Sequence, residues 1–349
     1  MSQFHKLRIQ DIQRETDKCV TISFEVPENL KDSFAFTAGQ YLTLKTQING
    51  EDVRRDYSIC SSPKSGDLKV AVKEIDNGTF SKFANRVLKP NDVLEVAAPQ
   101  GRFTFEPDPK KQRTIVAFAA GSGITPIMSI AKTVLSQEPN STFVLIYGNK
   151  TPKDAIFFND ILDLHHKYLD RFNLQLVFSQ SEEENAFFGR IEKSIVNFIV
   201  KNKYKHIDID AFYICGPEQM IDTVTDVLKE NGTKENAIHF ELFTTSKQDA
   251  KPISAEGTTD ITITVDEEEF TFNMSQKKTI LEAALENNID APYSCQGGIC
   301  SSCMARIVEG TATMRQNNIL TDGEIAEGLT LTCQAQPTSS KIVVDYDDI

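Results

Sequence analysis

The sequence predicts a multidomain fold, in which an antiparallel β-barrel is followed by a doubly wound α/β layer and then by a small acidic α+β module. Three observations carry this prediction. Residues 6–105 contain short alternating apolar and polar runs, apolar strands alternate with helix patterns from residue 114 onward, and a cysteine-rich segment follows a polar linker. A length of 349 residues allows two or three domains.

The first of these parts is predicted to be almost entirely β. The runs CVTISFEV, YLTLKTQI and DLKVAVKEI have the period of two that strands require, and NGED, SPKSGD and KPND mark turns between them. Only residues 80–88 have a helical pattern. A charged stretch interrupted by proline, residues 106–113, indicates a boundary, so we place this domain at 1–108.

The pattern of apolar residues changes at residue 114. Continuous apolar runs, typical of strands buried on both faces, alternate with amphipathic helix patterns. We therefore expect a parallel sheet in a domain at 109–245, followed by a polar linker at 246–259. The expected strands are 114–120, 142–148, 174–180 and 211–216, and the expected helices are 126–137, 154–168, 191–202 and 218–232.

The last domain, expected at 260–349, begins with a hairpin pattern at 261–273 and a helix pattern at 279–288. Its cysteines have the spacing C-x4-C-x2-C followed by a distant fourth, which is typical of plant-type [2Fe–2S] centres. Thiolates are soft ligands that favour iron–sulfur or zinc, but structural zinc usually shows paired C-x2-C knuckles, and disulfides need an oxidising compartment. The predicted cluster ligands are Cys295, Cys300, Cys303 and Cys333.

The charge of the sequence limits the possible partners, and its N-terminal segment indicates the location. The net charge of −13 argues against nucleic acid or an anionic membrane as a partner. Residues 252–349 carry 16 Asp and Glu against 5 Lys and Arg, which is either a docking face for a basic partner or a feature that serves solubility alone. The N-terminal sequence has no signal-peptide run, so we expect a cytoplasmic protein whose cysteines stay reduced.

Two glycine-containing segments after predicted strands are candidate nucleotide sites. AAGSGITPIM follows the first α/β strand and places Gly121, Gly123 and Pro126 where a pyrophosphate can bind at a helix N-terminus, although a tight strand–helix turn would look the same. YICGPEQM ends a later strand and places Cys215 at the carboxyl edge of the sheet, where open α/β folds bind ligands.

Two segments of the predicted barrel are also candidate sites for a nucleotide. RRDYSICSS brings together Arg55, Tyr57 and Ser58, which suit a phosphate, a flat ring and a ring nitrogen, although an ordinary alternating strand would also explain them. NGTFSKFA places Gly78 and Ser81 at a helix start, a second anion site. Two phosphate sites and an iron–sulfur module imply electron transfer between a nucleotide and a cluster.

Taken together, these motifs resemble the ferredoxin–NADP reductase superfamily fused to a C-terminal plant-type ferredoxin. The matching elements are R-x-Y-S, NGTFS, G-S-G-I-T-P, YGNKT, C-G-P-x-x-M and the four cysteines, in the family's order. The segments FHKLRI, RRDYSIC, LIYGNKT and CQAQP are similar to the reductase subunits of phenylacetyl-CoA epoxidases. The resemblance implies a flavin barrel that binds FAD, a domain that binds NADPH or NADH, and a β-grasp ferredoxin.

The resemblance also implies roles for individual residues. Ser58, Thr125 and Cys215 would surround the reacting centre, and Lys150, as a partner for a 2′-phosphate, favours NADPH over NADH. Arg55 would pair with FAD phosphate, Tyr57 would stack on the flavin, and Phe243 would cover part of it. The remaining cofactor-binding positions are Gly78, Thr79, Phe80 and Ser81 for the FAD pyrophosphate, and Gly121, Gly123, Pro126, Asn149, Thr151, Ser179, Gln180, Gly216 and Pro217 for the nicotinamide nucleotide.

The combined modules predict an oxidoreductase. A nicotinamide nucleotide delivers two electrons as a hydride, a cluster accepts one at a time, and a flavin can do both. By resemblance, the acceptor is a di-iron oxygenase that docks on the acidic ferredoxin domain and epoxidises an aromatic CoA thioester. The alternatives are the reductase of a phenol-hydroxylase or Rieske-type oxygenase, and a non-catalytic redox sensor or electron carrier, which the intact G-S-G-I-T-P and C-G-P motifs disfavour.

Overall fold

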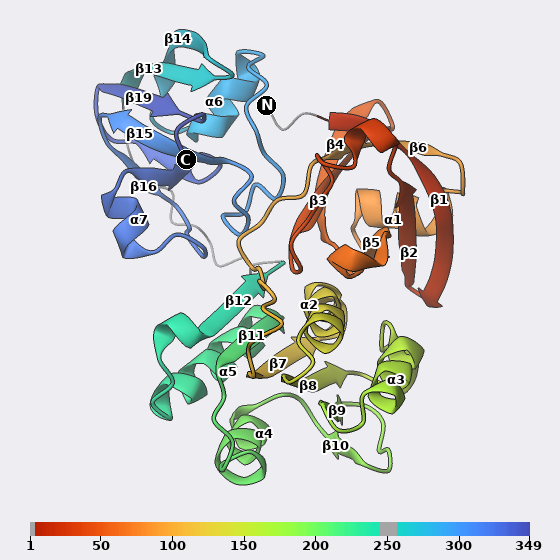
Figure 1. Ribbon diagram of the computed structural model, residues 1–349. Coiled ribbons are helices and arrows are strands. Elements are labelled where there is room, and N and C mark those ends of the chain that lie inside the picture. The colour runs from red at the N-terminus through yellow and green to blue at the C-terminus, as the bar shows by residue number, and fades with distance from the viewer. Residues whose placement is uncertain (1–3, 244–256) are drawn as a thin grey trace. The chain divides into compact units, whose positions relative to one another are not determined.

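The computed structural model describes residues 4–243 and 257–349 (Figure 1). The described chain divides into two compact units, one of residues 4–53 and 57–243 and one of residues 54–56 and 257–349. Most of the linker predicted at 246–259 lies outside the described residues, and a strand begins within its last residues at Thr258. In the part of the chain that is described, no helix is long and apolar enough to cross a membrane.

The first part of the chain forms a six-stranded antiparallel sheet with the strand order β4-β3-β6-β1-β2-β5. Ile59, directly after β4, bridges to Val70 on β5, which joins the two edge strands and closes the predicted barrel. The strands are β1 (Phe4–Thr16), β2 (Cys19–Glu25), β3 (Tyr41–Ile48), β4 (Glu51–Ser58), β5 (Leu68–Lys73) and β6 (Val93–Ala97).

One helix, α1 (Thr79–Arg86), covers the end of the barrel, where the sequence predicts a helix at 80–88. Phe80 and Ala84, one turn apart on the same helix face, are buried in the barrel core. The side-chain amide of Asn85 donates a 2.9 Å hydrogen bond to the carbonyl oxygen of Val72 on β5. This bond fixes the helix relative to the strand that leads into the NGTFS segment.

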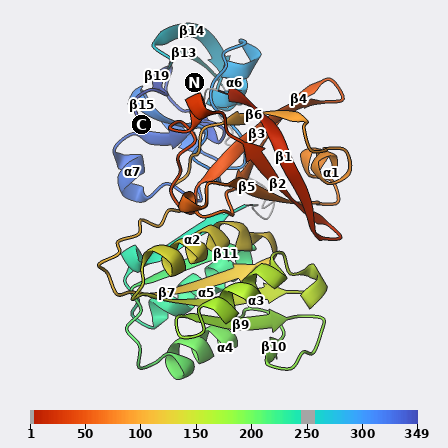
Figure 2. The same ribbon diagram turned by 45° about the vertical axis from the view of Figure 1, so that its right-hand side comes forward.

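The second sheet is fully parallel, with the order β10-β9-β8-β7-β11-β12. Its six strands are labelled in Figure 1, and Figure 2 shows the sheet from a second direction. The chain moves from β7 to β8 on one side and later returns to β11 on the other, so the order reverses beside β7. The strands are β7 (Thr114–Ala120), β8 (Thr142–Asn149), β9 (Phe172–Phe178), β10 (Ala186–Phe188), β11 (Ala211–Gly216) and β12 (Ile238–Leu242).

Helices cover both faces of this sheet, as the doubly wound fold requires. Ile115 and Ala117 of β7 share a core with the helix that follows, whereas Val116 is buried on the opposite face. The helix predicted at 191–202 is α4 followed by one π-helical segment, Phe198–Lys203. The α-helices are α2 (Ile124–Gln137), α3 (Phe158–Lys167), α4 (Lys193–Asn197) and α5 (Glu218–Glu230).

The C-terminal unit has a mixed five-stranded sheet, β14-β13-β19-β15-β17, and a two-stranded sheet, β16-β18. Apolar residues of α6, such as Ile280 and Ala284, share one core with Ile261 and Ile263 of β13, which gives the grasp-like α+β packing. The elements are β13 (Thr258–Val265), β14 (Glu268–Ser275), α6 (Ile280–Glu286), β15 (Met304–Glu309), β16 (Ala312–Met314), α7 (Asp322–Ala326), β17 (Leu329–Leu331), β18 (Ala335–Pro337) and β19 (Lys341–Asp345).

Local chemistry explains the start of this unit. Asp266 and Glu267 join β13 to β14 with φ angles of 54° and 63°, as a tight two-residue hairpin needs. The carboxylate of Asp347 accepts hydrogen bonds from both backbone N–H groups of this turn, at 3.0 and 2.8 Å. Thr279 and Glu282 form a capping box at the start of α6.

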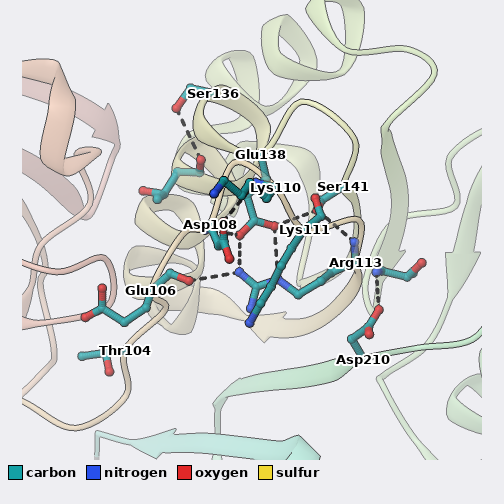
Figure 3. A network of polar contacts seen from close by, with 12 residues as sticks. Thr104, Glu106, Asp108, Lys110, Lys111, Arg113, Ser136, Glu138, Ser141 and Asp210 are labelled. Carbon is teal, nitrogen blue, oxygen red and sulfur yellow. Dashed lines mark hydrogen bonds and ion pairs between the residues drawn. The ribbon is translucent and has the colours of Figure 1, made fainter.

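A buried carboxylate ties the connector between the barrel and the parallel sheet to the end of α2. Glu138 has no solvent exposure and accepts hydrogen bonds from the backbone N–H of Asp108 at 2.8 Å, from the Ser141 hydroxyl at 2.7 Å and from Arg113 Nε at 3.2 Å (Figure 3). Arg113 also donates to the carbonyl oxygen of Glu106 at 3.0 Å. The predicted boundary at 106–113 is therefore fixed in place by this network.

Glu138→Ala is expected to lower the free energy of unfolding of the cofactor-loaded protein by about 3–5 kcal/mol, because it removes one partner of a buried ion pair. The measurement is denaturant unfolding. Glu106→Ala is the matched control: its exposed side chain is absent from the pair, and the expected change is below about 0.5 kcal/mol. A Glu138→Ala variant as stable as the control would contradict the role assigned to this network.

The same network predicts a pH effect. Burial alone would raise the pKa of Glu138, but hydrogen bonds from Arg113, Asp108 and Ser141 outweigh it and hold the pKa below its ordinary value of 4.5. The stabilisation from this group is therefore present above pH 4.5 and is lost as the pH falls through the lower pKa of the folded state. In Glu138→Gln the acid limb of the stability curve should be flatter than in the wild type.

Candidate redox sites

The carboxyl ends of neighbouring parallel strands bring the predicted nucleotide residues to one edge of the sheet. Cys215 on β11 is paired with Ala119 on β7 and with Glu241 on β12. Because the strands are parallel and in this register, the loops that follow them leave at the same edge. These loops and strand ends carry the predicted residues Gly121, Gly123, Thr125, Pro126, Asn149, Lys150, Thr151, Ser179, Gln180, Gly216 and Pro217.

The loop after β7 has the geometry of a phosphate-binding turn. Gly121 has a φ of 55°, and a Cβ on Gly123 would lie 2.1 Å from the carbonyl oxygen of Cys215, so only glycine fits there. The buried hydroxyl of Thr125, in the first turn of α2, donates a 3.0 Å hydrogen bond to the carbonyl oxygen of Ser122 in the turn that precedes the helix. The close packing requires Gly123 whether or not a nucleotide binds, while a helix N-terminus that follows a glycine turn suits an anion.

The adjacent strand ends hold the residues predicted to meet the adenosine end. The backbone N–H groups of Ser179 and Gln180 donate to the carbonyl oxygens of Asn149 and Lys150, at 3.0 and 2.9 Å, so the four residues form one extended edge. The side chains of Lys150 and Gln180 are exposed. Thr151 differs from the others, because its hydroxyl donates to the carboxylate of Asp154 at 2.7 Å.

A contact between the barrel and the parallel sheet completes this edge. The hydroxyl of Ser58, at the end of β4, donates a 3.2 Å hydrogen bond to the Glu241 carboxylate on β12. Cys215 lies opposite Glu241 in the sheet and is fully buried. Burial, and then the charge of Glu241, raise the pKa of the Cys215 thiol, so the thiol stays protonated and does not act as a nucleophile.

Sequence reasoning missed Glu241. It lies in the HFELF segment, where only Phe243 was singled out, and Phe243 itself is half-buried against the core that includes Cys215. An acidic residue between apolar residues of a short strand is the signal that could have drawn attention to it, because a charge at such a position needs a partner.

The barrel side of the site is built from β4 and α1. The ring of Tyr57 lies 5.5 Å from the ring of Phe80, with 35° between their planes, so both residues belong to one aromatic group. Arg55 is exposed on β4, and Thr79 is exposed at the start of α1. A Cβ on Gly78 would lie 2.1 Å from the Ser81 hydroxyl oxygen, so a side chain here would displace this hydroxyl.

A second residue absent from the sequence-based prediction is Lys73, the last residue of β5. Its ammonium nitrogen lies 3.4 Å from the position that a Cβ on Gly121 would occupy. The lysine therefore places a positive charge beside the phosphate-binding loop. A lysine at the end of a barrel strand carries no recognisable signal in the sequence, because its neighbour is set by the packing of the barrel on α2.

The four predicted cluster cysteines come together in the C-terminal unit as free thiols. The Sγ atoms of Cys300 and Cys295 lie 3.1 Å apart, and the side chain of Cys333 lies beside those of Cys295 and Cys303. Cys303 and Cys333 are 1% and 6% exposed, whereas the other two are half-buried. The result is one continuous group of sulfur atoms at the edge of a hydrophobic core.

The surroundings of these thiols fit a two-iron cluster. The backbone N–H of Gly297 donates to Cys295 Sγ at 3.3 Å. The Cys300 and Cys333 side chains, and then this N–H group, lower the pKa of Cys295. Among the described residues, no group of three or more His, Cys, Asp or Glu side chains is arranged to hold a metal ion. A [2Fe–2S] cluster instead divides four thiolates between two irons, and backbone N–H groups aimed at sulfur stabilise their charge.

Three family models match the chain in order. They are the oxidoreductase FAD-binding domain over residues 6–105, the oxidoreductase NAD-binding domain over residues 118–226, and the 2Fe-2S iron-sulfur cluster binding domain over residues 263–338. The chain belongs to the family of flavoprotein reductases that combine FAD, a nicotinamide nucleotide and a [2Fe–2S] cluster. The predicted fold class, enzyme class and cofactor set are thereby confirmed.

Relatives refine this assignment. The chain is 38% identical over 353 residues, 99% of each chain, to the E subunit of 1,2-phenylacetyl-CoA epoxidase from Escherichia coli (strain K12). It is 30% identical to the ferredoxin reductase component of 3-ketosteroid-9-alpha-monooxygenase from Rhodococcus rhodochrous, over 97% of this chain and 96% of the relative. The predicted likeness to phenylacetyl-CoA epoxidase reductase subunits is confirmed.

A solved structure has the same architecture. Phthalate dioxygenase reductase, described as a modular structure for electron transfer from pyridine nucleotides to [2Fe–2S], matches 98% of both chains with a TM-score of 0.62 and 24% identity. At this identity the match shows the fold, in which a flavin barrel, a nicotinamide domain and a ferredoxin follow one another.

Glu241→Ala is expected to lower the rate constant of flavin reduction by NADPH about tenfold or more, because Ser58 loses the partner that orients its hydroxyl. Anaerobic stopped-flow absorbance measures this rate. Glu235→Ala is the matched control, since this exposed carboxylate from the preceding segment pairs with Lys229 and should leave the rate unchanged. Equal rates for Glu241→Ala and the wild type, at saturating NADPH, would contradict the assignment.

Proposed function

We propose that this chain is the reductase component of a multicomponent oxygenase, passing electrons from NADPH through FAD and a [2Fe–2S] cluster to a di-iron oxygenase that epoxidises an aromatic CoA thioester. The observation that carries the redox role is the contact of Ser58 with Glu241 beside Cys215, which joins the barrel to the carboxyl edge of the parallel sheet. The identity to the phenylacetyl-CoA epoxidase relative supports the choice of acceptor.

The residues of the barrel bind FAD, and those of the parallel sheet bind the nicotinamide nucleotide. When bound, FAD accepts an electron pair as hydride and releases single electrons, which is the form that a [2Fe–2S] cluster accepts. Arg55 binds the FAD phosphate, Tyr57 supports the ring, and the turn of residues 78–81 approaches the pyrophosphate. Thr125, Pro126 and Cys215 form the opposite wall, against which the nicotinamide is held.

Ser58 and Glu241 orient the reacting groups. The Glu241 carboxylate holds the hydroxyl proton of Ser58, so the remaining lone pairs of the serine oxygen have a fixed direction. The protonated, buried thiol of Cys215 provides a small uncharged surface for the nicotinamide. Because hydride transfer needs no side-chain acid or base, Glu241 acts as a positioning residue and not as a general base.

Positive charge at the start of α2 holds the nicotinamide nucleotide. The glycine turn that leads into α2 and the ammonium group of Lys73 bind its pyrophosphate, because a helix N-terminus and a cation lie at one place. Asn149, Ser179 and Gln180 border the adenosine. Lys150, exposed at the same edge, binds the 2′-phosphate that distinguishes NADPH from NADH.

In the C-terminal unit, Cys295, Cys300, Cys303 and Cys333 ligate the cluster. The acidic surface of this unit docks the oxygenase through complementary charge, which raises the association rate at low salt. A cytoplasmic location would keep the thiols reduced for cluster assembly. The 30% identity to the ferredoxin reductase component of a 3-ketosteroid-9-alpha-monooxygenase supports a second candidate, the reductase of another multicomponent oxygenase, such as one of phenol-hydroxylase or Rieske type.

Lys150→Met is expected to reduce the preference for NADPH over NADH about tenfold, because a charge-assisted hydrogen bond contributes about 1.5–3 kcal/mol. The readout is the ratio of kcat/KM for the two donors, with cytochrome c as acceptor. Lys153→Met removes an exposed lysine nearby and serves as the control, which should keep the wild-type ratio. A ratio that Lys150→Met leaves unchanged would contradict the proposed 2′-phosphate contact.

The acceptor is tested by reconstitution. Purified chain, NADPH and the oxygenase subunits of phenylacetyl-CoA epoxidase should consume NADPH and form an epoxide from phenylacetyl-CoA, with a rate that falls as salt rises. A Rieske-type oxygenase under the same conditions should turn over much more slowly. Turnover with the Rieske partner alone would favour the second candidate, and failure of NADPH to bleach the flavin band would support a sensor instead.

A further inference from the structure

Gln334, directly after Cys333, reaches across to the loop that carries Cys295. Its side-chain Nε2 donates a 2.9 Å hydrogen bond to the carbonyl oxygen of Gln296. The residue is only 9% exposed, and its own backbone is fixed at both ends, because its N–H donates to Leu331 at 2.8 Å and its carbonyl accepts from Arg315 at 2.9 Å. The backbone that carries this amide is therefore held in place by hydrogen bonds on both sides.

The peptide that Gln334 holds is the one that faces the sulfur. The carbonyl of Gln296 and the N–H of Gly297 belong to a single planar peptide unit, in which they point in opposite directions. The carbonyl end points to Gln334, and the N–H end donates to Cys295 Sγ at 3.3 Å. Rotation of this unit would break both hydrogen bonds at once.

The backbone around this peptide has an uncommon conformation. Gln296 has a φ of 52°, in the left-handed region that residues with a side chain seldom adopt. Gly298 has a φ of 69°, and a Cβ there would lie 3.1 Å from Gln334 Cγ. A loop in such a conformation needs contacts that hold it, and the amide of Gln334 supplies one of them.

We propose that Gln334 is a positioning residue for the cluster, because its amide locks the Gln296–Gly297 peptide with the N–H directed at Cys295 Sγ. This inference rests on the proposed ligand set. Donation to a ligating sulfur stabilises the reduced cluster, which carries one more negative charge, and so raises the reduction potential. Loss of the lock should lower the potential and loosen the loop over the cluster.

Gln336 provides a matched control. It lies two residues further on, is 1% exposed, and uses the same amide group to donate to the carbonyl oxygens of Lys277 at 2.7 Å and Gln276 at 3.2 Å. These acceptors precede α6 and lie outside the cysteine loop. Replacement of either glutamine removes a buried amide from the same segment, but only Gln334 contacts the Gln296–Gly297 peptide.

The test compares Gln334→Met and Gln336→Met in the full-length holoprotein. EPR-monitored titration gives the cluster potential and g-values, and loss of visible absorbance in the presence of a chelator gives the rate of cluster release. Gln334→Met should have a more negative potential, altered g-values and release about tenfold faster or more, as is typical when a partner outside the ligand set is lost. Gln336→Met should keep the wild-type potential.

The proposal fails if Gln334→Met keeps the wild-type potential and release rate, or if both methionine variants shift alike. If Gln334→Met does not fold, Gln334→Asn is the second variant, because its side chain keeps the amide but is one methylene too short to reach the Gln296 carbonyl oxygen. It must show the same negative shift of the cluster potential for the proposal to stand. A wild-type protein without iron and without an EPR signal would instead overturn the proposed function, so the two failures can be told apart.

Discussion

The redox site depends on the parallel register of β7, β11 and β12. This register places the end of β11 against the loop after β7 so closely that a Cβ on Gly123 would meet the Cys215 carbonyl oxygen at 2.1 Å. It also carries Glu241, one strand further, to the hydroxyl of Ser58 on the barrel. A shift of β11 or β12 by one residue would turn Cys215 or Glu241 to the other face of the sheet and separate the residues of the site.

The loop that carries Cys295, Cys300 and Cys303 is held in place by side-chain and backbone hydrogen bonds and not by strand pairing. Its cysteines belong to no regular strand ladder, and backbone N–H groups must turn toward sulfur atoms that repel one another when ionised. The loop meets this requirement with left-handed residues and with side-chain amides that hold peptide units from outside, as Gln334 does with Gln296. Stability and redox tuning therefore depend on the same hydrogen bonds.

Much of this organisation could be predicted from the sequence, because its signals are local. The cysteine spacing and the runs at 114–120 and 211–216 depend on neighbouring residues, and the latter two match β7 and β11 residue for residue. The partners of Glu241 and Lys73 could not be found this way, since tertiary packing sets them. The π-helical segment after α4 was missed for a different reason, because hydrophobic periodicity does not show where a helix widens its hydrogen-bond pattern.

The central claim is that electron pairs from a nicotinamide nucleotide leave this chain singly through the four-cysteine cluster. Anaerobic titration of the holoprotein with NADPH, followed by absorbance and EPR together, tests it most directly. The account predicts that the flavin band bleaches and that a rhombic [2Fe–2S] signal grows with it, in protein that contains iron and labile sulfide. Flavin bleaching in iron-loaded protein whose cluster stays oxidised throughout, even at high NADPH, would contradict it.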